Sequence, residues 1–322
     1  MIDNGKPRAF AFSITPFDEN DRLDEATLRA HLRRLRDAGI GVYMGGSGGG
    51  EAYSLTPAEH QRVLEIGVEE MKGKVPVYAA SFEPRTAAQM YEHAQVAIKA
   101  GVDAVQLYAV EGGHGMVPTD RELEAYFDEL ITQIDSKIII ASHQGLRYKF
   151  DIGLLSRLIH RYVDKIIAVN FIQESPSYLI DMHDAFGDKV KIYSGGTKWA
   201  ITNLGLGGWG FNSSETNVMP NTAMTVIEAF KRGDVGTAVE AHMSMLRLTR
   251  AFDVLAPATP RPMKTILQLL GLPSGQLRKP YLTPVGEELE RMRRYLAKFD
   301  ILGTERKFAE YRARVTEESD AH

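Results

Sequence analysis

Residues 75–108 read VPVYAASFEPRTAAQMYEHAQVAIKAGVDAVQLY and contain one complete strand–helix–strand unit. Val75–Ala80 and Ala104–Tyr108 are short apolar runs of the kind that forms buried strands. Between them, Thr86–Ala100 has helical periodicity and begins with a threonine that can cap the helix. Such a unit takes roughly 30 residues, and its helix returns the chain so that the two strands run parallel. The stretch therefore predicts an α/β fold built on a parallel sheet.

The same alternation continues on both sides of this stretch. Six further apolar runs are expected to be strands: Ala9–Ile14, Val42–Gly45, Ile138–Ser142, Ile166–Phe171, Val190–Ser194 and about Gly208–Asn212. The stretches between them are amphipathic, as at Leu23–Ala38, Pro57–Met71 and Thr119–Ile134. Thr56 and Glu59, at the start of the second of these, have the spacing of a capping box. A doubly wound open sheet needs a reversal of strand order, which sequence cannot show, and eight regular units favour a closed (β/α)8 TIM barrel.

The chain turns wholly helical after the eighth strand. The barrel is expected to span residues 1–221, followed by a C-terminal helical extension over residues 222–322. Helical patterns in the extension cover Thr222–Arg232, Val235–Leu255, Arg261–Leu270 and Thr283–Phe299. Because no change of composition marks a second core, we expect the extension to pack on the barrel as one structural unit. The charged segment Glu305–His322 is expected to be a helix on a neighbouring subunit or a frayed end.

The composition excludes several classes of protein. The 38 Lys and Arg residues against 42 Asp and Glu residues give a net charge of −4, which indicates neither a nucleic-acid surface nor a polybasic membrane patch. Cysteine is absent, which excludes disulfides, thiolate zinc sites and a cysteine nucleophile. Met1–Arg8 has no apolar signal-peptide core, and no run approaches the roughly 18 apolar residues of a membrane span. We therefore expect a cytoplasmic protein whose partner is a small molecule.

A glycine-rich segment follows the second expected strand directly: Gly45-Gly46-Ser47-Gly48-Gly49-Gly50-Glu51. It is either a tight βα turn or a cradle whose backbone N–H groups hold an anion such as a substrate carboxylate. It is not a phosphate loop, because Gly-Lys-Ser/Thr is missing, and its glycine spacing does not match the dinucleotide fingerprint. Because barrel sites lie at the C-terminal ends of the strands, we expect these residues to bind substrate: Ser47, Gly48, Gly49, Gly50 and Glu51.

A series of short motifs runs in a characteristic order from about residue 8 to residue 298. They are Thr15-Pro16-Phe17-Asp18, Gly50-Glu51 with Leu55-Thr56 and Glu59, Ala100-Gly101-Val102-Asp103-Ala104, Pro118-Thr119, Gly205 to Gly210, Asn217, Pro220, Lys264, Leu270-Gly271-Leu272-Pro273-Ser274-Gly275 and Arg278-Lys279-Pro280. Each motif alone is weak. Together, their order and spacing resemble the dihydrodipicolinate synthase / N-acetylneuraminate lyase family of class I aldolases.

The resemblance implies a (β/α)8 barrel that is usually tetrameric, so we expect a homo-oligomer, either a tetramer or a dimer. It also implies a strand-six lysine that forms a Schiff base with a 2-oxo acid, typically pyruvate. A Gly-Thr-Thr-Gly loop holds the carboxylate of that acid, and a strand-five tyrosine relays protons. No cofactor is implied, and none is expected here.

This sequence departs from that pattern at the positions that do the chemistry. The Schiff-base lysine falls at Asn170, whose amide cannot form an iminium. Lys165 is no substitute, since it lies five residues earlier, some 16 Å along the strand at about 3.3 Å per residue. The two threonines fall at Gly48 and Gly49, and the tyrosine falls at Ala141 or Ser142. The chain thus resembles a divergent member of the family that lacks the strand-six lysine.

Polar groups nevertheless remain at the expected rim. The candidate catalytic residues are Ser142, His143, His114, Asn170 and Lys198, and Gln173 and Gly195 join the glycine loop as candidate substrate-binding residues. Either histidine could act as a general acid or base, or be an ordinary surface or core residue. Asn170 could polarise a carbonyl or be a structural remnant. Lys198 could supply an amine, clamp a carboxylate or be a solvated lysine, and a Schiff-base role would need burial to lower its pKa.

Glu51, His114 and His143 could form a two-histidine, one-carboxylate metal site, but no His-x-x-x-His spacing supports one, and we expect no metal. Three functions follow from these residues. The first is a lyase, either an aldolase or a hydro-lyase, acting on a small 2-oxo acid or related carboxylate without the usual Schiff base. The second is a non-catalytic carboxylate-binding protein on an aldolase barrel. The third is a Schiff-base aldolase that uses Lys198.

Overall fold

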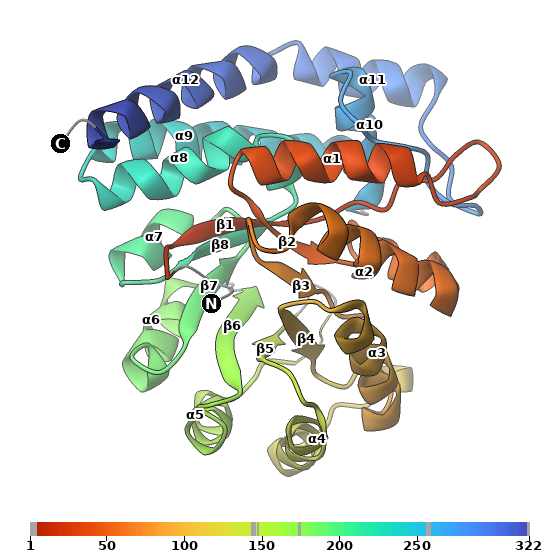
Figure 1. Ribbon diagram of the computed structural model, residues 1–322, viewed down its shortest axis with the longest axis vertical. Helices are drawn as coiled ribbons and strands as arrows, with labels where there is room; N and C mark the ends of the chain where they lie inside the picture. Colours follow the sequence, from red (N-terminus) through yellow and green to blue (C-terminus); the bar gives the residue numbers. More distant parts are fainter. Residues whose placement is uncertain (1–4, 143–145, 147, 173–174, 256–258, 321–322) are drawn as a thin grey trace.

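The computed structural model describes residues 5–142, 146, 148–172, 175–255 and 259–320. Eight parallel strands close into a barrel in chain order, with β1 paired to both β2 and β8 (Figure 1). The strands are β1 (Arg8–Phe12), β2 (Gly41–Met44), β3 (Val77–Ala79), β4 (Ala104–Tyr108), β5 (Ile138–Ala141), β6 (Ile166–Ile172), β7 (Lys191–Gly195) and β8 (Gly210–Ser213). The predicted TIM barrel is confirmed, and the expected strands differ from the observed ones by a few residues at their ends.

Helices alternate with the strands and cover the outside of the barrel (Figure 1). They are α1 (Glu25–Asp37), α2 (Pro57–Met71), α3 (Ala87–Ala100), α4 (Asp120–Gln133), α5 (Ile152–Arg161), α6 (Pro176–Phe186), α7 (Ala200–Gly205) and α8 (Pro220–Lys231). The capping box at Thr56 and Glu59 is present as predicted, and Thr119 with Glu122 forms a second one. Threonine caps therefore place the starts of α2 and α4 just beyond the loops that leave the C-terminal ends of β2 and β4.

Aromatic side chains fill the interior of the barrel. The ring of Phe10 lies 5.0 Å from Tyr78, 5.3 Å from Tyr193 and 5.4 Å from Tyr43, measured between centroids. All four side chains are almost completely buried. Tyr43 on β2 points into the barrel and contacts Phe10 there. Alternate residues of a strand face the same side, and at Gly41, two residues earlier, an added Cβ would lie 2.3 Å from the Phe10 ring. This aromatic layer closes the interior below the C-terminal ends of the strands, so the barrel is a packed core and not a pore.

The chain beyond β8 forms five long helices among the described residues. After α8 come α9 (Val235–Thr249), α10 (Pro260–Leu269), α11 (Gly286–Leu296) and α12 (Ile301–Asp320). Helix α8 packs on β1 and α7, which is the position of the eighth barrel helix. The expected boundary at residue 221 therefore falls within the first turn of α8, a helix that packs on the barrel. We propose that the barrel and the extension fold as one unit. No helix in the described part of the chain combines the length and apolar character needed to cross a bilayer.

Helix α12 docks along α8 of its own chain (Figure 1). Phe308 is buried at this contact. The Glu305 carboxylate accepts hydrogen bonds from the backbone N–H groups of Asn221 (2.6 Å) and Thr222 (3.0 Å), which begin α8. Arg312 pairs with Glu228 at 2.7 Å. The expectation of a frayed end or a helix on a neighbouring subunit is wrong for residues 305–318, because these contacts hold them on the barrel of the same chain.

Candidate active site

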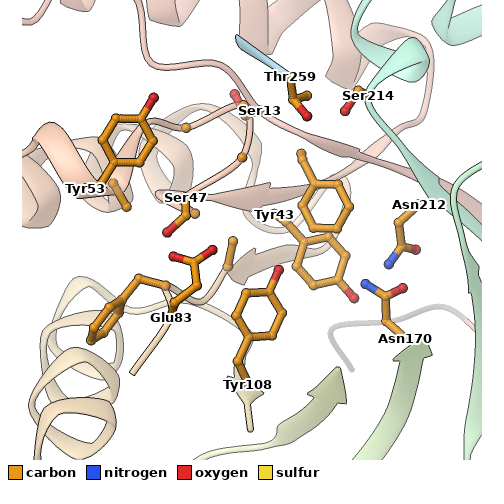
Figure 2. A pocket seen from close by; sticks show the side chains of 18 of the residues that line it. Ser13, Tyr43, Ser47, Tyr53, Glu83, Tyr108, Asn170, Asn212, Ser214 and Thr259 are labelled. Carbon is orange, nitrogen blue, oxygen red and sulfur yellow. The ribbon is translucent and has the colours of Figure 1, made fainter. Parts of the chain in front are cut away.

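A cavity of about 1200 Å³ opens at the C-terminal ends of the strands. Its walls come from the C-terminal ends of the strands and the loops that follow them, and from residues between the end of α9 and the start of α10. Figure 2 shows polar side chains from several of these segments converging on one space. A site assembled from many strand ends is the arrangement in which TIM-barrel enzymes bind their substrates.

The glycine loop lines this cavity from Gly46 to Gly50. Close packing requires some of its glycines: a Cβ at Gly46 would lie 2.5 Å from Ala80 Cβ, and one at Gly49 would lie 2.8 Å from the carbonyl oxygen of Phe12. Gly48 has open space around it. Among the described residues, the backbone N–H groups of Gly48, Gly49 and Gly50 have no hydrogen-bond acceptor. The loop is thus held by its neighbours while its free donors remain available for an anion.

Glu51 turns away from the cavity, contrary to the expectation that it contacts substrate. Its backbone is left-handed, with φ of 50°, and its carboxylate forms a buried ion pair with Lys264 on α10. Lys264 Nζ also donates to the carbonyl oxygens of Thr15 and Gln276, both at 2.7 Å. Burial raises the pKa of Glu51 and lowers that of Lys264, while each charge opposes the shift of the other. The pair ties the glycine loop to the loop after β1 and to α10.

The floor of the cavity carries polar atoms that lack partners. Tyr43 Oη, Asn170 Oδ1 and both amide atoms of Asn212 are buried and make no hydrogen bond of normal length and angle within the described chain. Figure 2 shows the three side chains, from β2, β6 and β8, pointing toward one another. Burial raises the pKa of Tyr43 well above its usual value, so its hydroxyl stays protonated and can donate. The Asn212 side chain nevertheless lies close enough to the Tyr43 hydroxyl to oppose the rise of its pKa. Unsatisfied buried polar atoms in a cavity are costly unless a ligand or water binds there.

The other predicted residues lie in different places. Ser142 and Gly195 line the cavity, and Ser142 Oγ accepts a hydrogen bond from the backbone N–H of Ile172 at 3.1 Å. Lys198 lies at the rim, is exposed, and sits 5.0 Å from the centre of the Trp199 ring. His114 is exposed in a short turn and is not among the residues that line the cavity. His143 and Gln173 are outside the described residues.

Sequence reasoning missed Tyr43 and Asn212. Both lie inside strands, and the sequence predicts only the strands Val42–Gly45 and about Gly208–Asn212 at these positions. Asn212 could have been predicted by the reasoning used for Asn170, because it too is an asparagine near the C-terminal end of a strand. Within the part of the chain that the structure describes, no three His, Asp or Glu side chains gather in a metal-binding arrangement.

Arg278 braces the segment that follows the glycine loop, and this contact makes stability depend on pH. Its guanidinium donates to both carboxylate oxygens of Glu59, at 2.6 and 2.8 Å, and to the carbonyl oxygen of Ser54 at 3.0 Å. The Arg278 side chain is the main cause that lowers the pKa of Glu59 from 4.5 to about 2. Because the pKa is lower in the folded protein, the pair stabilises fully above pH 4.5 and loses its effect as the pH falls toward 2.

We expect the Tm of the unaltered protein to fall more steeply between pH 4.5 and 2 than that of Glu59→Gln, measured by circular dichroism. Glutamine keeps the capping geometry of α2, so the comparison isolates the charge. Parallel curves for the two proteins over this range would show that the ion pair contributes nothing.

A sequence profile of the Dihydrodipicolinate synthetase family matches residues 6–298, nearly the whole chain. The chain belongs to the dihydrodipicolinate synthetase family. The resemblance inferred from the motifs is confirmed. This is a family of lyases of the pyruvate-dependent aldolase type, which process small molecules. The match to the dihydrodipicolinate synthetase family ends before α12, so that helix lies outside the matched region.

Named relatives in the dihydrodipicolinate synthetase family cover most of the chain. The 4-hydroxy-tetrahydrodipicolinate synthase of Methanopyrus kandleri is 31% identical over 306 residues, 90% of this chain and 95% of that protein. The enzyme of the same name from Pelobacter propionicus is 28% identical over 277 residues, 85% of this chain and 91% of that protein.

Solved structures share the fold. A dihydrodipicolinate synthase from Bacillus anthracis has a TM-score of 0.83 at 24% identity and covers 93% of this chain and 100% of that one. A family protein from E. coli K12, solved in complex with pyruvate, has a TM-score of 0.82 at 21% identity, with 91% and 98% covered. Both likenesses support the barrel architecture of this member of the dihydrodipicolinate synthetase family.

Strand β6 of this family member carries no lysine between Ile166 and Ile172. Lys165 precedes the strand, and its Nζ donates to the carbonyl oxygens of Ile131 (2.7 Å) and Ile134 (2.9 Å). These contacts hold the amine at the N-terminal end of the strand, opposite the cavity. Lys198 is therefore the lysine among the described residues that line the cavity.

Proposed function

We propose that this chain is a lyase that acts on a small 2-oxo acid or related carboxylate without forming a lysine Schiff base. The observation that carries the proposal is the cluster of polar side chains from Tyr43, Asn170 and Asn212 at the floor of the cavity, in which the Tyr43 hydroxyl and the Asn212 NH2 group are buried donors without partners among the described residues. Hydrogen-bond donors fixed in a buried site stabilise negative charge that develops on a carbonyl oxygen. Such donors can replace an iminium as the means of stabilising an enolate.

The remaining lining residues support a binding mode for the carboxylate. The free N–H groups of Gly48, Gly49 and Gly50 supply donors for its oxygens. Ser47 Oγ is buried without a partner beside them and adds a further donor. The keto oxygen then faces the Tyr43 hydroxyl and the two asparagine amides. In aldol cleavage a base takes the proton of the substrate's β-hydroxyl, which becomes the carbonyl of the released aldehyde as the carbon–carbon bond breaks. The electron pair of that bond forms the C=C bond of the enolate, the former carbonyl π pair moves onto oxygen, and the donors bind this enolate oxygen until the carbon is protonated.

The proton carrier stays a prediction. His143 directly follows Ser142, which lines the cavity, and its imidazole is suited to moving a proton near neutral pH. Lys198 is exposed, whereas an amine that forms a Schiff base is usually activated by a desolvated environment or a neighbouring cation. The exposure of Lys198 therefore favours the route without an iminium.

The test is to incubate the protein with pyruvate and borohydride and record its intact mass, with a lysine-bearing aldolase of the family labelled in parallel. We expect the mass of the protein to stay unchanged. We also expect small 2-oxo acids to raise its Tm and at least one of the stabilising compounds to be turned over. A gain that maps to Lys198 would establish the Schiff-base alternative. Stabilisation without turnover of any compound would identify a carboxylate-binding protein.

A further inference from the structure

The carboxylate of Glu83 lies in the cavity without a cationic partner. Glu83 is partly buried in the loop after β3, and Figure 2 shows its carboxylate pointing into the cavity beside Ser47 and Tyr108. No ion pair or hydrogen bond links this side chain to another residue in the described part of the chain. Arg85, two positions later, also lines the cavity but forms no ion pair with Glu83. The Arg85 guanidinium instead lies beside Gly113, where an added Cβ would be 3.4 Å from it.

A second acid makes this wall of the cavity more negative. Glu111, after β4, also lines the cavity, and its backbone N–H donates to the carbonyl oxygen of Pro84 at 2.8 Å. This bond holds the loop after β4 against the loop that carries Glu83. The charge of Glu83 contributes to the raised pKa values of Tyr53 and Tyr108, for both of which burial is the larger cause. The charge of Glu83 thus acts on the hydroxyl groups of both tyrosines.

The combination of an unpaired carboxylate and aromatic rings suits one chemical class of ligand. A carboxylate partly removed from water is best compensated by a cation that forms charge-assisted hydrogen bonds with it. Faces of aromatic rings also attract cations, and Figure 2 shows the ring of Tyr108 beside the Glu83 carboxylate. A primary ammonium group can interact with both. A second carboxylate or a bulky apolar group would be disfavoured at the same position.

We propose that the substrate carries a cationic nitrogen in addition to its carboxylate, and that Glu83 binds this nitrogen. The inference rests on the proposed function, because it places the carboxylate of the substrate at Gly48–Gly50. The substrate class is then an amino-substituted carboxylic acid, with its negative end at the glycine loop and its positive end at Glu83. Glu83 selects the substrate, and the floor residues stabilise the reacting carbonyl.

The test compares matched pairs of probes by isothermal titration calorimetry: β-alanine against propanoate, and 4-aminobutanoate against butanoate. We expect at least one amino compound to bind the unaltered protein about tenfold or more tightly than its partner. Glu83→Gln should remove this advantage and leave the Kd of the plain carboxylate unchanged or improved. Glu288→Gln, which removes the same charge from an exposed position on α11, should retain the advantage.

The outcomes separate this inference from the function on which it rests. Equal binding of amino and plain carboxylates, or a preference that survives in Glu83→Gln, would overturn the role of Glu83 while the carboxylate site stands. Failure of the unaltered protein to bind either class would overturn the role of Glu83 together with the carboxylate site at Gly48–Gly50, while the lyase itself is tested separately with 2-oxo acids. If Glu83→Gln melts at a lower temperature, Glu83→Asp serves as the second variant, because it keeps the charge and should retain part of the preference.

Discussion

Replacing Lys264 by methionine is expected to lower the free energy of unfolding by about 3–5 kcal/mol, because it leaves a buried carboxylate without its cation. Lys264 is 1% exposed, and its partner Glu51 is fully buried. The change also removes the donor to the carbonyl oxygens of Thr15 and Gln276. Three loops lose one shared donor, so binding of carboxylates at the glycine loop should weaken as well.

Urea denaturation of the variant and of a matched control measures this effect. Lys99→Met removes an exposed lysine from α3 and should change the free energy of unfolding by no more than about 0.5 kcal/mol. The double variant Glu51→Gln with Lys264→Met should lose less than the sum of the two single changes, since it removes both charges together. A loss below about 1 kcal/mol in Lys264→Met would contradict the assigned role of the pair.

The loss in Lys264→Met should also depend on pH. Burial already raises the pKa of Glu51 in the folded protein, and without the ammonium of Lys264 nothing of comparable strength opposes that shift. A carboxyl whose pKa is higher in the folded state takes up a proton on folding, so stability is greatest at low pH and falls as the pH rises through that pKa. The difference between variant and unaltered protein should therefore be smaller near pH 5 than near pH 8.

Alanine at Asn170 is expected to lower kcat/KM for the carboxylate that is turned over by about 10²–10³-fold, the usual effect of removing one oxyanion donor. No hydrogen bond joins the Asn170 side chain to another residue in the part of the chain that the structure describes, so the truncation leaves no other described buried group unsatisfied. Stability should therefore change little. Asn170→Asp should be at least as impaired, because it places a negative charge where the enolate oxygen forms.

Asn203 provides the matched control for Asn170. Its amide donates to the carbonyl oxygens of Ile192 (2.9 Å) and Gly210 (2.8 Å), which joins β7 and β8. Asn203→Ala should cost about 1–3 kcal/mol of stability, because it removes these two buried hydrogen bonds and leaves the His183 ring, which contacts Asn203 Oδ1 at 2.9 Å, without that partner. Its kcat/KM, per folded molecule, should be close to that of the unaltered protein. If Asn170→Ala loses stability and keeps kcat/KM, the catalytic assignment is wrong.

The barrel could be predicted from sequence because each strand–helix unit carries its own local signals. Apolar runs and threonine caps occur where β3, α2 and α4 begin, and they do not depend on distant contacts. The docking of α12 could not be predicted in this way. Its contacts join Glu305 to Asn221 and Arg312 to Glu228, and charged residues of this kind also suit a solvated tail.

The sequence predicts those residues of the candidate site whose placement depends only on their position along a strand. Asn170, Ser142 and Gly195 lie at or next to the C-terminal ends of β6, β5 and β7, and all three line the cavity. The position of Glu51 was not predictable, because its left-handed backbone and its pairing with Lys264, 213 positions away, direct the side chain elsewhere. Both depend on tertiary contacts that a local pattern does not contain.

The docking of α12 also affects the order in which the barrel is completed during synthesis. Glu305 is translated 84 residues after Asn221, whose N–H it binds, and Arg312 is translated 274 residues after Ala38, whose carbonyl oxygen it binds at 2.9 Å. The start of α8 and the end of α1 therefore lack these partners until α12 has left the ribosome. The surface of α8 that α12 later covers is uncovered on the nascent chain during that interval, when transiently exposed surface is open to chaperones.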